Sequence, residues 1–511
     1  MTPARTPHPD LGSSRERVKR LFKNTGIYTI GEAGVQLLTA LLTPILTVLL
    51  LPAELGLWSL ALMLYTGFMH LCNPALHGSV TRFYFDHEGE PAAQKRFQGT
   101  ILSFLLIWSF GLCVVATFTG ESLFAKLFND LPFWPYGAFI VWTTFLGVLA
   151  VVPKSIWIAA EKAKSIVGLS LLGNTVYTVG ALGLVALTSL GVLGLFVARA
   201  ASLLVIAAPL LVYSLRQVGL AWSWTDLRAA LKFSLPLVPH LIAHWVLGMS
   251  DRFIIEHHYA GGPGGLDLQP GDVDSGDSER PGLAAVGIYM AAYAFIEAVN
   301  MIAKSMNSAW VPQFTRAHER PDQRGFVAHS ITSFILAIAA MSAAMIVLSP
   351  TIVRGIFDPK YALAAEIAPI LAFGGLFQGL YYVYVGILFY YKENRLIPVM
   401  TVVSGAINVA LNLLWIPKYG LAGAAWATVI GYGVLVIGVR WASRRFVMPA
   451  FETGRLLKIA AVLGGVTIAG LVIDGRLGLG WELLAKLGVI GAGGLALWLL
   501  GVFAPRVHPT A

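Results

Sequence analysis

Long apolar runs, separated by short polar segments, form the dominant pattern of this chain. A helix that crosses a bilayer needs about 20 mostly apolar residues, and fourteen runs meet that requirement. They predict membrane spans at 25–49, 56–81, 99–119, 136–160, 166–188, 192–214, 231–257, 284–311, 327–349, 363–391, 397–416, 421–441, 455–473 and 482–503. We therefore expect an all-α polytopic membrane protein with about fourteen transmembrane helices.

Composition and charge agree with this pattern. The 511 residues are 57% hydrophobic and only 12% charged, which excludes a soluble domain of this size. The net charge is +9, and the basic residues gather in alternate short loops. If the N-terminus is inside, 25 Lys and Arg residues fall in cytoplasmic segments and 6 in outer loops. This asymmetry predicts cytoplasmic termini, and it explains the charge without a nucleic-acid partner.

An internal repeat divides the predicted spans. Gly56 near the start of span two matches Gly287 in span eight at an offset of 231. Gly191 near span six matches Gly420 near span twelve at an offset of 229. Chance alignment of glycines in apolar helices is the alternative, since small residues are common where such helices pack. Two similar six-span halves are the usual build of secondary transporters.

The repeat and the charge pattern together predict the organisation of the chain. Two six-helix bundles are expected, followed by two additional helices. The predicted segments are a cytoplasmic tail at 1–24, the first bundle at 25–214, a cytoplasmic linker at 215–230, the second bundle at 231–441 with a flexible outer loop at 260–283, two additional spans at 442–503 and a cytoplasmic tail at 504–511. The Gly- and Asp-rich outer loop has too little apolar content to fold alone.

Four basic residues fall within predicted spans or at their inner ends. Charges inside a membrane are rare and usually line a cavity, so these residues are candidates for a substrate-binding cationic cavity. They are Arg82, Lys154, Arg199 and Lys304. Arginine binds phosphate groups bidentately and lysine acts as a point charge, so the lining suits a pyrophosphate. Snorkelling or a structural pair is the alternative for the deeper residues.

Three carboxylates within spans are candidates for ion coupling: Glu32, Glu297 and Glu366. A buried carboxylate has a raised pKa and can carry a proton. A helix–helix hydrogen bond is an equal alternative for Glu32. No cofactor is expected, and a proton or a sodium ion would be the coupling ion.

The stretch "FSLPLVPHLIAHWVLGMSDRFIIEHHY" at 233–259 is unusually polar for a span. Its prolines are expected to bend the helix, and its histidines lie one turn apart on one face. The Asp-Arg pair is expected near the outer mouth, as a gate, a substrate contact or an interfacial anchor. The candidate gate or cavity-lining residues are Pro236, Pro239, His240, His244, Asp251 and Arg252. A metal site is not expected, because no third ligand accompanies the histidines.

Four motifs carry a family resemblance: "FSLPLVPHLIAHWVLGMSDRFII", "LGLWSLALM", "AAEKAKSI" and "YGLAGAAWATVIGYGVL". They resemble the Wzx-type lipid-linked oligosaccharide flippases, the polysaccharide-export branch of the multidrug/oligosaccharidyl-lipid/polysaccharide (MOP) superfamily. The resemblance covers roughly residues 20–445. It implies two six-helix bundles in a V-shaped, MATE-like arrangement in a bacterial inner membrane.

The resemblance also implies a function. Such a protein moves a polyprenyl (undecaprenyl)-pyrophosphate-linked oligosaccharide across the membrane for polysaccharide biosynthesis, by alternating access through a cationic cavity. Membrane lipids, a polysaccharide polymerase and glycosyltransferases are candidate partners. A MATE-like multidrug or cation antiporter is one alternative, although it would favour acidic and aromatic linings. A membrane-bound glycan polymerase or ligase is another, although no substantial catalytic loop is evident.

Overall fold

The computed structural model describes residues 41–87, 89–160, 162–259, 281–318, 324–391, 395–444 and 452–503, together with 31, 34, 35, 38 and 446. All the secondary structure in this part is helical. Twelve of its helices are long and apolar enough to cross a membrane. One of them, α14, bends at Gly420 and so contains two consecutive spans, and residues 41–49 form the end of a further helix. The expected all-α polytopic fold class is confirmed.

The helices follow each other through short connections. Their bounds are α2 Pro52–Cys72, α3 Leu76–Asp86, α4 Pro91–Leu127, η1 Phe133–Gly137, α5 Ala138–Leu149, α6 Val151–Ala159, α7 Ala163–Leu187, α8 Leu193–Gln217, α9 Trp224–Ser234, η2 Leu235–Leu237, α10 Val238–His258, α11 Pro281–His318, α12 Arg324–Ile356, η4 Pro359–Tyr361, α13 Ala364–Tyr390, α14 Leu396–Ser443, α15 Thr453–Ile473 and α16 Leu479–Leu499.

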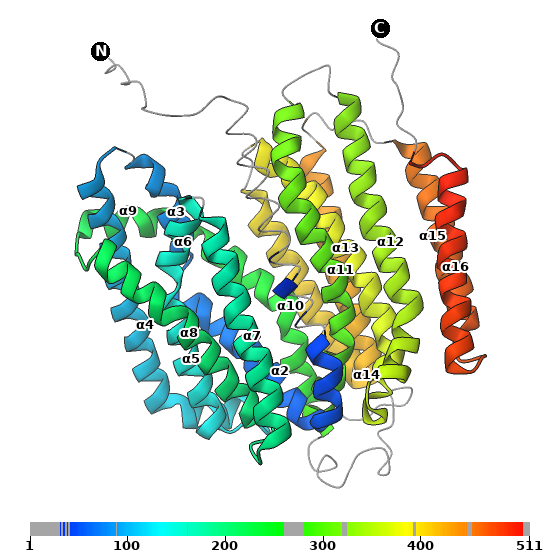
Figure 1. Cartoon of the computed structure of the whole chain (residues 1–511), viewed down its shortest axis with the longest axis horizontal. Coiled ribbons are helices and arrows are strands. Elements are labelled where there is room, and N and C mark those ends of the chain that lie inside the picture. Colours follow the sequence, from blue (N-terminus) through cyan, green and yellow to red (C-terminus); the bar gives the residue numbers. More distant parts are fainter. Residues whose placement is uncertain are drawn as a thin grey trace.

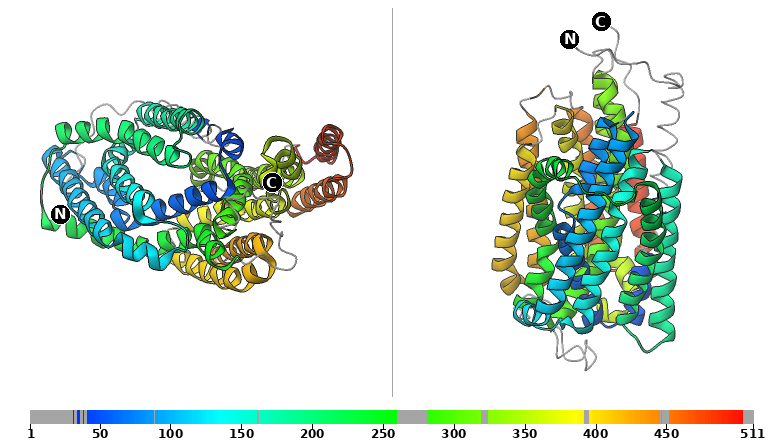
Figure 2. Two further views of the ribbon diagram at one scale, coloured as in Figure 1. Left: turned by 90° about the horizontal axis from the view of Figure 1, so that it is seen from below. Right: turned by 90° about the vertical axis from the view of Figure 1, so that its left-hand side faces the viewer.

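The helices form two groups that converge toward one end of the molecule. Figure 1 shows α3–α9 on the left and α10–α14 on the right, with the groups closest near its lower edge, as in a V. The view from below in Figure 2 keeps the groups side by side, with α15 and α16 at the outer edge of the right-hand group. These last two helices contact α12.

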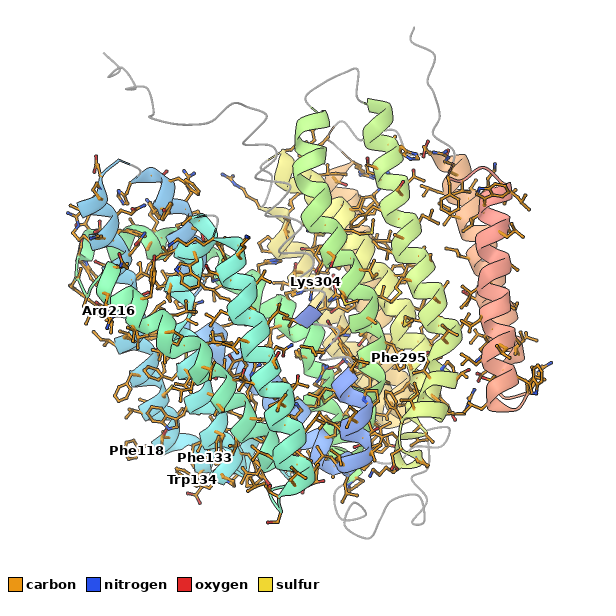
Figure 3. The ribbon with its side chains drawn as sticks, viewed as in Figure 1. Phe118, Phe133, Trp134, Arg216, Phe295 and Lys304 are labelled. Atoms are coloured by element: carbon orange, nitrogen blue, oxygen red, sulfur yellow. The ribbon has the colours of Figure 1, made fainter. Side chains whose placement is uncertain are left out.

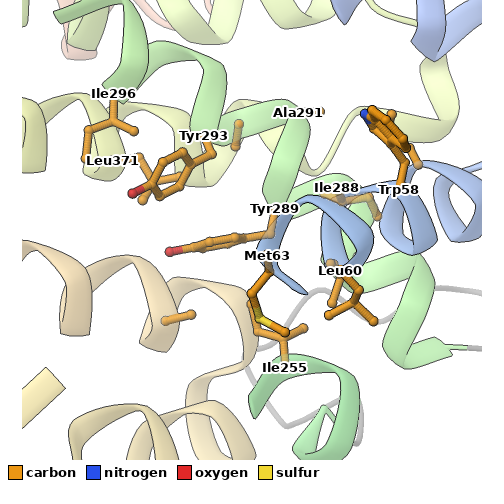
Figure 4. Close-up of a cluster of buried hydrophobic side chains, with 14 of the residues drawn as sticks. Trp58, Leu60, Met63, Ile255, Ile288, Tyr289, Ala291, Tyr293, Ile296 and Leu371 are labelled. Atoms are coloured by element: carbon orange, nitrogen blue, oxygen red, sulfur yellow. The ribbon is translucent and has the colours of Figure 1, made fainter. Parts of the chain in front are cut away.

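The two groups meet through α2, α10 and α11. Figure 4 shows apolar side chains from these helices packed together, with Leu371 of α13 beside them. Trp58, Leu60, Ile255, Ile288 and Tyr289 are all at least 96% buried. Trp245 of α10 also donates a hydrogen bond from its indole nitrogen to the Met63 carbonyl oxygen of α2 at 3.0 Å. The core of the molecule therefore lies at the junction of the groups, where close side-chain packing and interhelical hydrogen bonds hold them together.

Two predicted spans are interrupted. Span 56–81 ends as α2 at Cys72, and α3 begins at Leu76. Pro74 cannot continue the α2 hydrogen-bond ladder, and the Asn73 side chain accepts a bond from the Leu76 amide at 3.1 Å instead. Span 136–160 is similarly divided into α5 and α6 at residue 150. The positions of these breaks were not predicted.

Some predicted features lie outside the described residues. These are the tails 1–24 and 504–511, residues 260–280 of the outer loop, and Glu32. The segment predicted as a linker at 215–230 contains the start of α9, which Ser223 caps by accepting a hydrogen bond from the Asp226 amide at 3.3 Å.

Candidate functional site

A polar cavity of about 430 Å³ lies among α2, α5, α6, α7 and α8. Lys154 of α6 and Arg199 of α8 both line it, so two of the four predicted basic residues are brought together. Asn73, Ser170, Asn174 and Ser202 supply uncharged polar groups to the same lining. The volume falls in the range of about 300–1,000 Å³ that small-molecule sites occupy. Two cations in one cavity repel each other, and an anion between them would relieve that repulsion.

Aromatic rings position Arg199. Its guanidinium carbon lies 5.3 Å from the centre of the Tyr65 ring and 5.9 Å from that of Tyr177. Tyr177 is itself fixed by stacking on Trp58, with the ring centres 6.1 Å apart. The Nε atom of Arg199 is buried and has no hydrogen-bond partner among the described residues. Buried polar groups are nearly always paired, so this donor favours an external acceptor.

The polar groups around the cavity are held by the helices that carry them. Asn174 donates its amide to the Val35 carbonyl oxygen at 2.8 Å. Ser202 donates to the Gly173 carbonyl oxygen at 2.7 Å. These bonds fix α7 against its neighbours and keep the lining in one arrangement. Sequence reasoning missed these residues, because uncharged polar side chains within apolar spans are common.

Lys304 of α11 lies near three histidine side chains, which belong to α2 and α10. Lys304, His240 and His70 lie close enough to His244 to act on it electrostatically. The ring centres of His240 and His244 are 6.3 Å apart, and His240 Nδ1 lies 3.1 Å from the Thr401 hydroxyl of α14. Figure 3 labels Lys304 near mid-height, between the two groups of helices. Lys304 is not among the described residues that line the cavity with Arg199.

Arg82 does not join either basic group. It lies on α3 with its side chain 63% exposed and pairs with Asp86 one turn away at 3.8 Å. It is not among the residues that line the polar cavity. A role of Arg82 in a cationic cavity stays a prediction.

The candidate coupling carboxylates differ in environment. Glu366 is exposed in the first turn of α13, where a carboxylate is stabilised by the helix dipole, so it is not buried as expected. Glu297 is exposed on α11 and accepts a hydrogen bond from the Asn300 amide at 3.4 Å. It also acts electrostatically on Arg252.

Asp251 and Arg252 are buried rather than placed at an outer mouth. Asp251 is 1% exposed and Arg252 5% exposed. Arg252 donates to the Asp251 carboxylate at 2.9 Å and to the Ser59 hydroxyl of α2 at 3.1 Å. The Tyr289 hydroxyl of α11 donates to Asp251 at 2.8 Å, and the Tyr293 ring centre lies 4.4 Å from the guanidinium. Buried charges need such a complete set of partners, so the pair links the two groups of helices.

Pro236 and Pro239 mark the junction of two helices. Pro236 lies in η2 and Pro239 in the first turn of α10, the position where a missing amide hydrogen is tolerated. The prolines therefore lie where α9 meets α10 and not in the middle of α10. A role of this junction as a gate stays a prediction.

Glu256 closes the other end of α10, a contact that sequence reasoning did not identify. Its carboxylate accepts hydrogen bonds from the backbone amides of Asn129 at 2.8 Å and Asp130 at 3.2 Å. The Phe128 ring packs edge-on against Phe253 of α10, with the ring centres 5.6 Å apart. This contact, which we call the Glu256 latch, fixes the segment after α4 to the right-hand group of helices.

Comparison with known proteins places the chain in a family. A family model described as polysaccharide biosynthesis protein matches residues 21–318. An uncharacterized membrane protein of Methanocaldococcus jannaschii is 24% identical over 230 residues, 44% of this chain and 45% of the relative. The probable low-salt glycan biosynthesis flippase of Haloferax volcanii is 23% identical over 221 residues, 43% of this chain and 44% of the relative. The chain thus aligns with less than half the length of these relatives.

Solved structures share the fold. The lipid II flippase MurJ, in an inward closed conformation, matches with a TM-score of 0.70 over 94% of this chain and 99% of that chain, at 13% identity. A multidrug resistance MATE family transporter of the MOP superfamily, in an inward-facing conformation, matches with a TM-score of 0.61 over 86% and 96%, at 15% identity. At such identities the likeness concerns the fold, and it confirms the expected MATE-like architecture.

Proposed function

Because the chain belongs to the polysaccharide biosynthesis protein family, we propose that it is a transporter rather than an enzyme, and specifically a flippase for a polyprenyl-pyrophosphate-linked oligosaccharide. The name of the Haloferax volcanii relative, a probable glycan biosynthesis flippase, supports this proposal. The carrier lipid is proposed to be undecaprenyl and the membrane a bacterial inner membrane, with both termini in the cytoplasm.

The observation that carries the proposal is the polar cavity with Arg199 and Lys154 in its lining. The unpaired Nε of Arg199 is a donor suited to a phosphate oxygen. The faces of Tyr65 and Tyr177 support the guanidinium without neutralising its charge. In our proposal, this cavity binds the pyrophosphate group, while the sugars lie on the water-filled side and the lipid chain stays in apolar surroundings.

Translocation is proposed to proceed by rocking of the two groups of helices. The buried Asp251–Arg252 pair and the Glu256 latch join the groups in the present arrangement. In an alternating-access cycle these contacts would break as the cavity becomes accessible from the other side. Glu297 and Glu366 are both exposed, so neither has the buried setting expected of a proton carrier, and a role of either in coupling to a proton or a sodium ion stays a prediction.

A multidrug or cation antiporter is the second candidate, because the MATE transporters share the fold. A site for cationic drugs requires acidic groups around the ligand. Among the described residues, the polar cavity is instead lined by two cations and no Asp or Glu. We therefore place the antiporter below the flippase.

Ligand binding by the purified protein in lipid nanodiscs tests the proposed anion site. The ligand is an undecaprenyl-pyrophosphate-linked oligosaccharide, and free pyrophosphate serves as competitor. Arg199→Ala is expected to weaken binding about 10- to 100-fold, the range for hydrogen bonds to charged groups. Arg199→Lys should recover only part of the affinity, because an ammonium cannot bind bidentately.

Arg216 provides a matched control, since it is an exposed arginine of the same helix α8. Figure 3 labels it at the outer edge of the left-hand group. Arg216→Ala should leave binding unchanged. Equal binding by Arg199→Ala and the wild type would remove the anion site from the proposal, and no binding by the wild type would count against the flippase.

A further inference from the structure

A second cavity, of about 280 Å³, lies between α2, α4, α5 and α10. Its lining is almost wholly apolar, with His70 as the one ionisable side chain. Five aromatic side chains form much of the wall: Phe68, Phe124, Phe128, Phe133 and Trp245. Figure 3 labels Phe133 in the lower part of the left-hand group. We call this space the apolar cavity.

The rim of the apolar cavity consists of exposed leucine and isoleucine side chains. Leu71, Leu123, Leu127 and Ile242 are each between 37% and 54% exposed. They lie in helices that are long and apolar enough to cross a membrane. Such side chains contact lipid, so a ligand enters from the hydrocarbon region and is itself apolar.

Helix α2 separates the apolar cavity from the polar one. Tyr65 and Met69, four residues apart, line the polar cavity. Leu64 and Phe68, also four residues apart, line the apolar cavity. Residues four positions apart lie on the same face of a helix, so one face of α2 lines the polar cavity and another lines the apolar cavity.

We propose that the apolar cavity binds part of the isoprenoid chain of the substrate's lipid carrier. This inference rests on the proposed flippase function and adds a site for the lipid portion of the substrate. An apolar cavity of about 150 Å³ holds a benzene ring, so this one has room for roughly ten carbon atoms, about two isoprene units. Aromatic walls suit the methyl groups and double bonds of such a chain.

The polar cavity on the other face of α2 favours the carrier lipid over bulk phospholipid. Its Lys154 and Arg199 lie in helices that are long and apolar enough to cross a membrane. The anionic head group that we propose to bind there would therefore be held at depth, beside a chain in the apolar cavity. The head group of a bulk phospholipid stays at the membrane surface.

Photolabelling in nanodiscs tests the proposal. One probe is a polyprenyl phosphate with a diazirine near the middle of its chain, and the other is a phosphatidylglycerol with a diazirine in its acyl chain. We expect the polyprenyl probe to label the α4 segment 116–128, and unlabelled polyprenyl phosphate to compete. Ala116→Phe projects a ring into the cavity and should lower labelling several-fold, because the ring occupies space that the chain would fill.

Val115→Phe is the matched control, because Val115 is the neighbouring residue of α4, is 58% exposed and does not line the apolar cavity. It should be labelled like the wild type. Leu123→Trp at the rim provides a second variant if Ala116→Phe does not fold, as judged by thermal unfolding. Three results would each overturn the proposal. The first is labelling by the phospholipid probe as strong as that by the polyprenyl probe, with no competition by unlabelled polyprenyl phosphate. The second is a folded cavity variant that is labelled like the wild type, and the third is a segment 116–128 that carries no label.

The polyprenyl phosphate probe carries no glycan, so the experiment separates the two claims. Competed labelling by a protein that moves no lipid-linked glycan would retain the chain site and refute the flippase function. Glycan movement without labelling at this cavity would retain the function and refute the site.

Discussion

Gly56 of α2 and Gly287 of α11 face each other where the two groups of helices converge. A Cβ atom at Gly56 would lie 1.8 Å from the Leu283 carbonyl oxygen, and one at Gly287 would lie 1.9 Å from that of Pro52. The backbones are therefore in direct contact, as small residues permit in membrane helices. These two glycines are the pair that the internal repeat matched, so equivalent positions of the two repeats meet at the point of contact.

A side chain at this crossing is expected to force the helices apart. Gly287→Ala should destabilise the protein by about 1–3 kcal/mol, since the clash is with backbone atoms that cannot rotate away. The fall in thermal unfolding temperature in detergent measures this effect. Gly464→Ala in α15 is the control, because a Cβ there meets nothing within 4 Å. Equal unfolding temperatures for Gly287→Ala and Gly464→Ala would show that α2 and α11 can move apart at this crossing without loss of stability.

The buried Asp251–Arg252 pair predicts a strong and asymmetric mutational effect. Asp251→Ala leaves Arg252 buried without its carboxylate and should destabilise the protein by about 3–5 kcal/mol. The double variant Asp251→Leu/Arg252→Met removes both charges and should therefore lose less stability. Unfolding in detergent measures the stability of both variants. Arg82→Ala, which breaks an exposed pair, should have little effect. A double variant less stable than Asp251→Ala would contradict this account.

The Glu256 latch predicts a change in accessibility. Glu256→Ala leaves the amides of Asn129 and Asp130 without their acceptor, so the segment after α4 should open more often. A cysteine at Asn129 should then react several-fold faster with a membrane-impermeant maleimide, because each lost hydrogen bond is worth about 1 kcal/mol. The native cysteines Cys72 and Cys113 are buried and give little background.

Glu121→Ala is the matched control for the latch, since it removes an exposed carboxylate from α4. The double variant Glu121→Ala/Asn129→Cys should react with the maleimide at the same rate as Asn129→Cys alone. The same acceleration in both variants would mean that general loss of negative charge, and not the latch, governs access.

An ionic network at the α15–α16 turn predicts a dependence on pH. Burial favours the neutral form of Asp474, but hydrogen bonds from Arg354 and Lys486 outweigh this and lower the pKa of Asp474 below its ordinary value of 3.8. A carboxylate with a lowered pKa in the folded state contributes stability above its unfolded pKa and loses it as pH falls through the folded value. Lys486 is fully buried, so it depends on this carboxylate and on Glu482.

The attachment of α15 and α16 to α12 should therefore weaken below about pH 4 in the wild type. Asp474→Asn should be less stable than the wild type at pH 7, and its stability should change less between pH 5 and pH 3. Thermal unfolding across this range is the measurement. A parallel fall in stability of both proteins would assign the acid response to other groups.

The spans could be predicted from the sequence because a bilayer requires long apolar helices, and the repeat located glycines whose roles the structure explains. Gly191 and Gly420, matched in the repeat, both adopt a positive φ, 49° and 55°, where the chain turns into the next span. This conformation follows from local sequence, since glycine adopts it without strain.

The partners of the charged residues could not be predicted. Arg199 and Arg252 have the same residue type and both lie within spans, but one borders a cavity and the other is neutralised by Asp251. That difference depends on contacts with helices distant in the sequence. Pro74 could be seen in the sequence, but the exposed pairing of Arg82 with Asp86 on the helix after it could not.

Transbilayer movement of an undecaprenyl-pyrophosphate-linked oligosaccharide in proteoliposomes tests the central claim most directly. The account predicts that the wild-type protein moves this lipid, that Arg199→Ala moves it much more slowly, and that Arg216→Ala moves it at the wild-type rate. Absence of movement by the wild type with several glycans, together with efflux of a cationic drug from the same vesicles, would contradict the flippase and favour the antiporter.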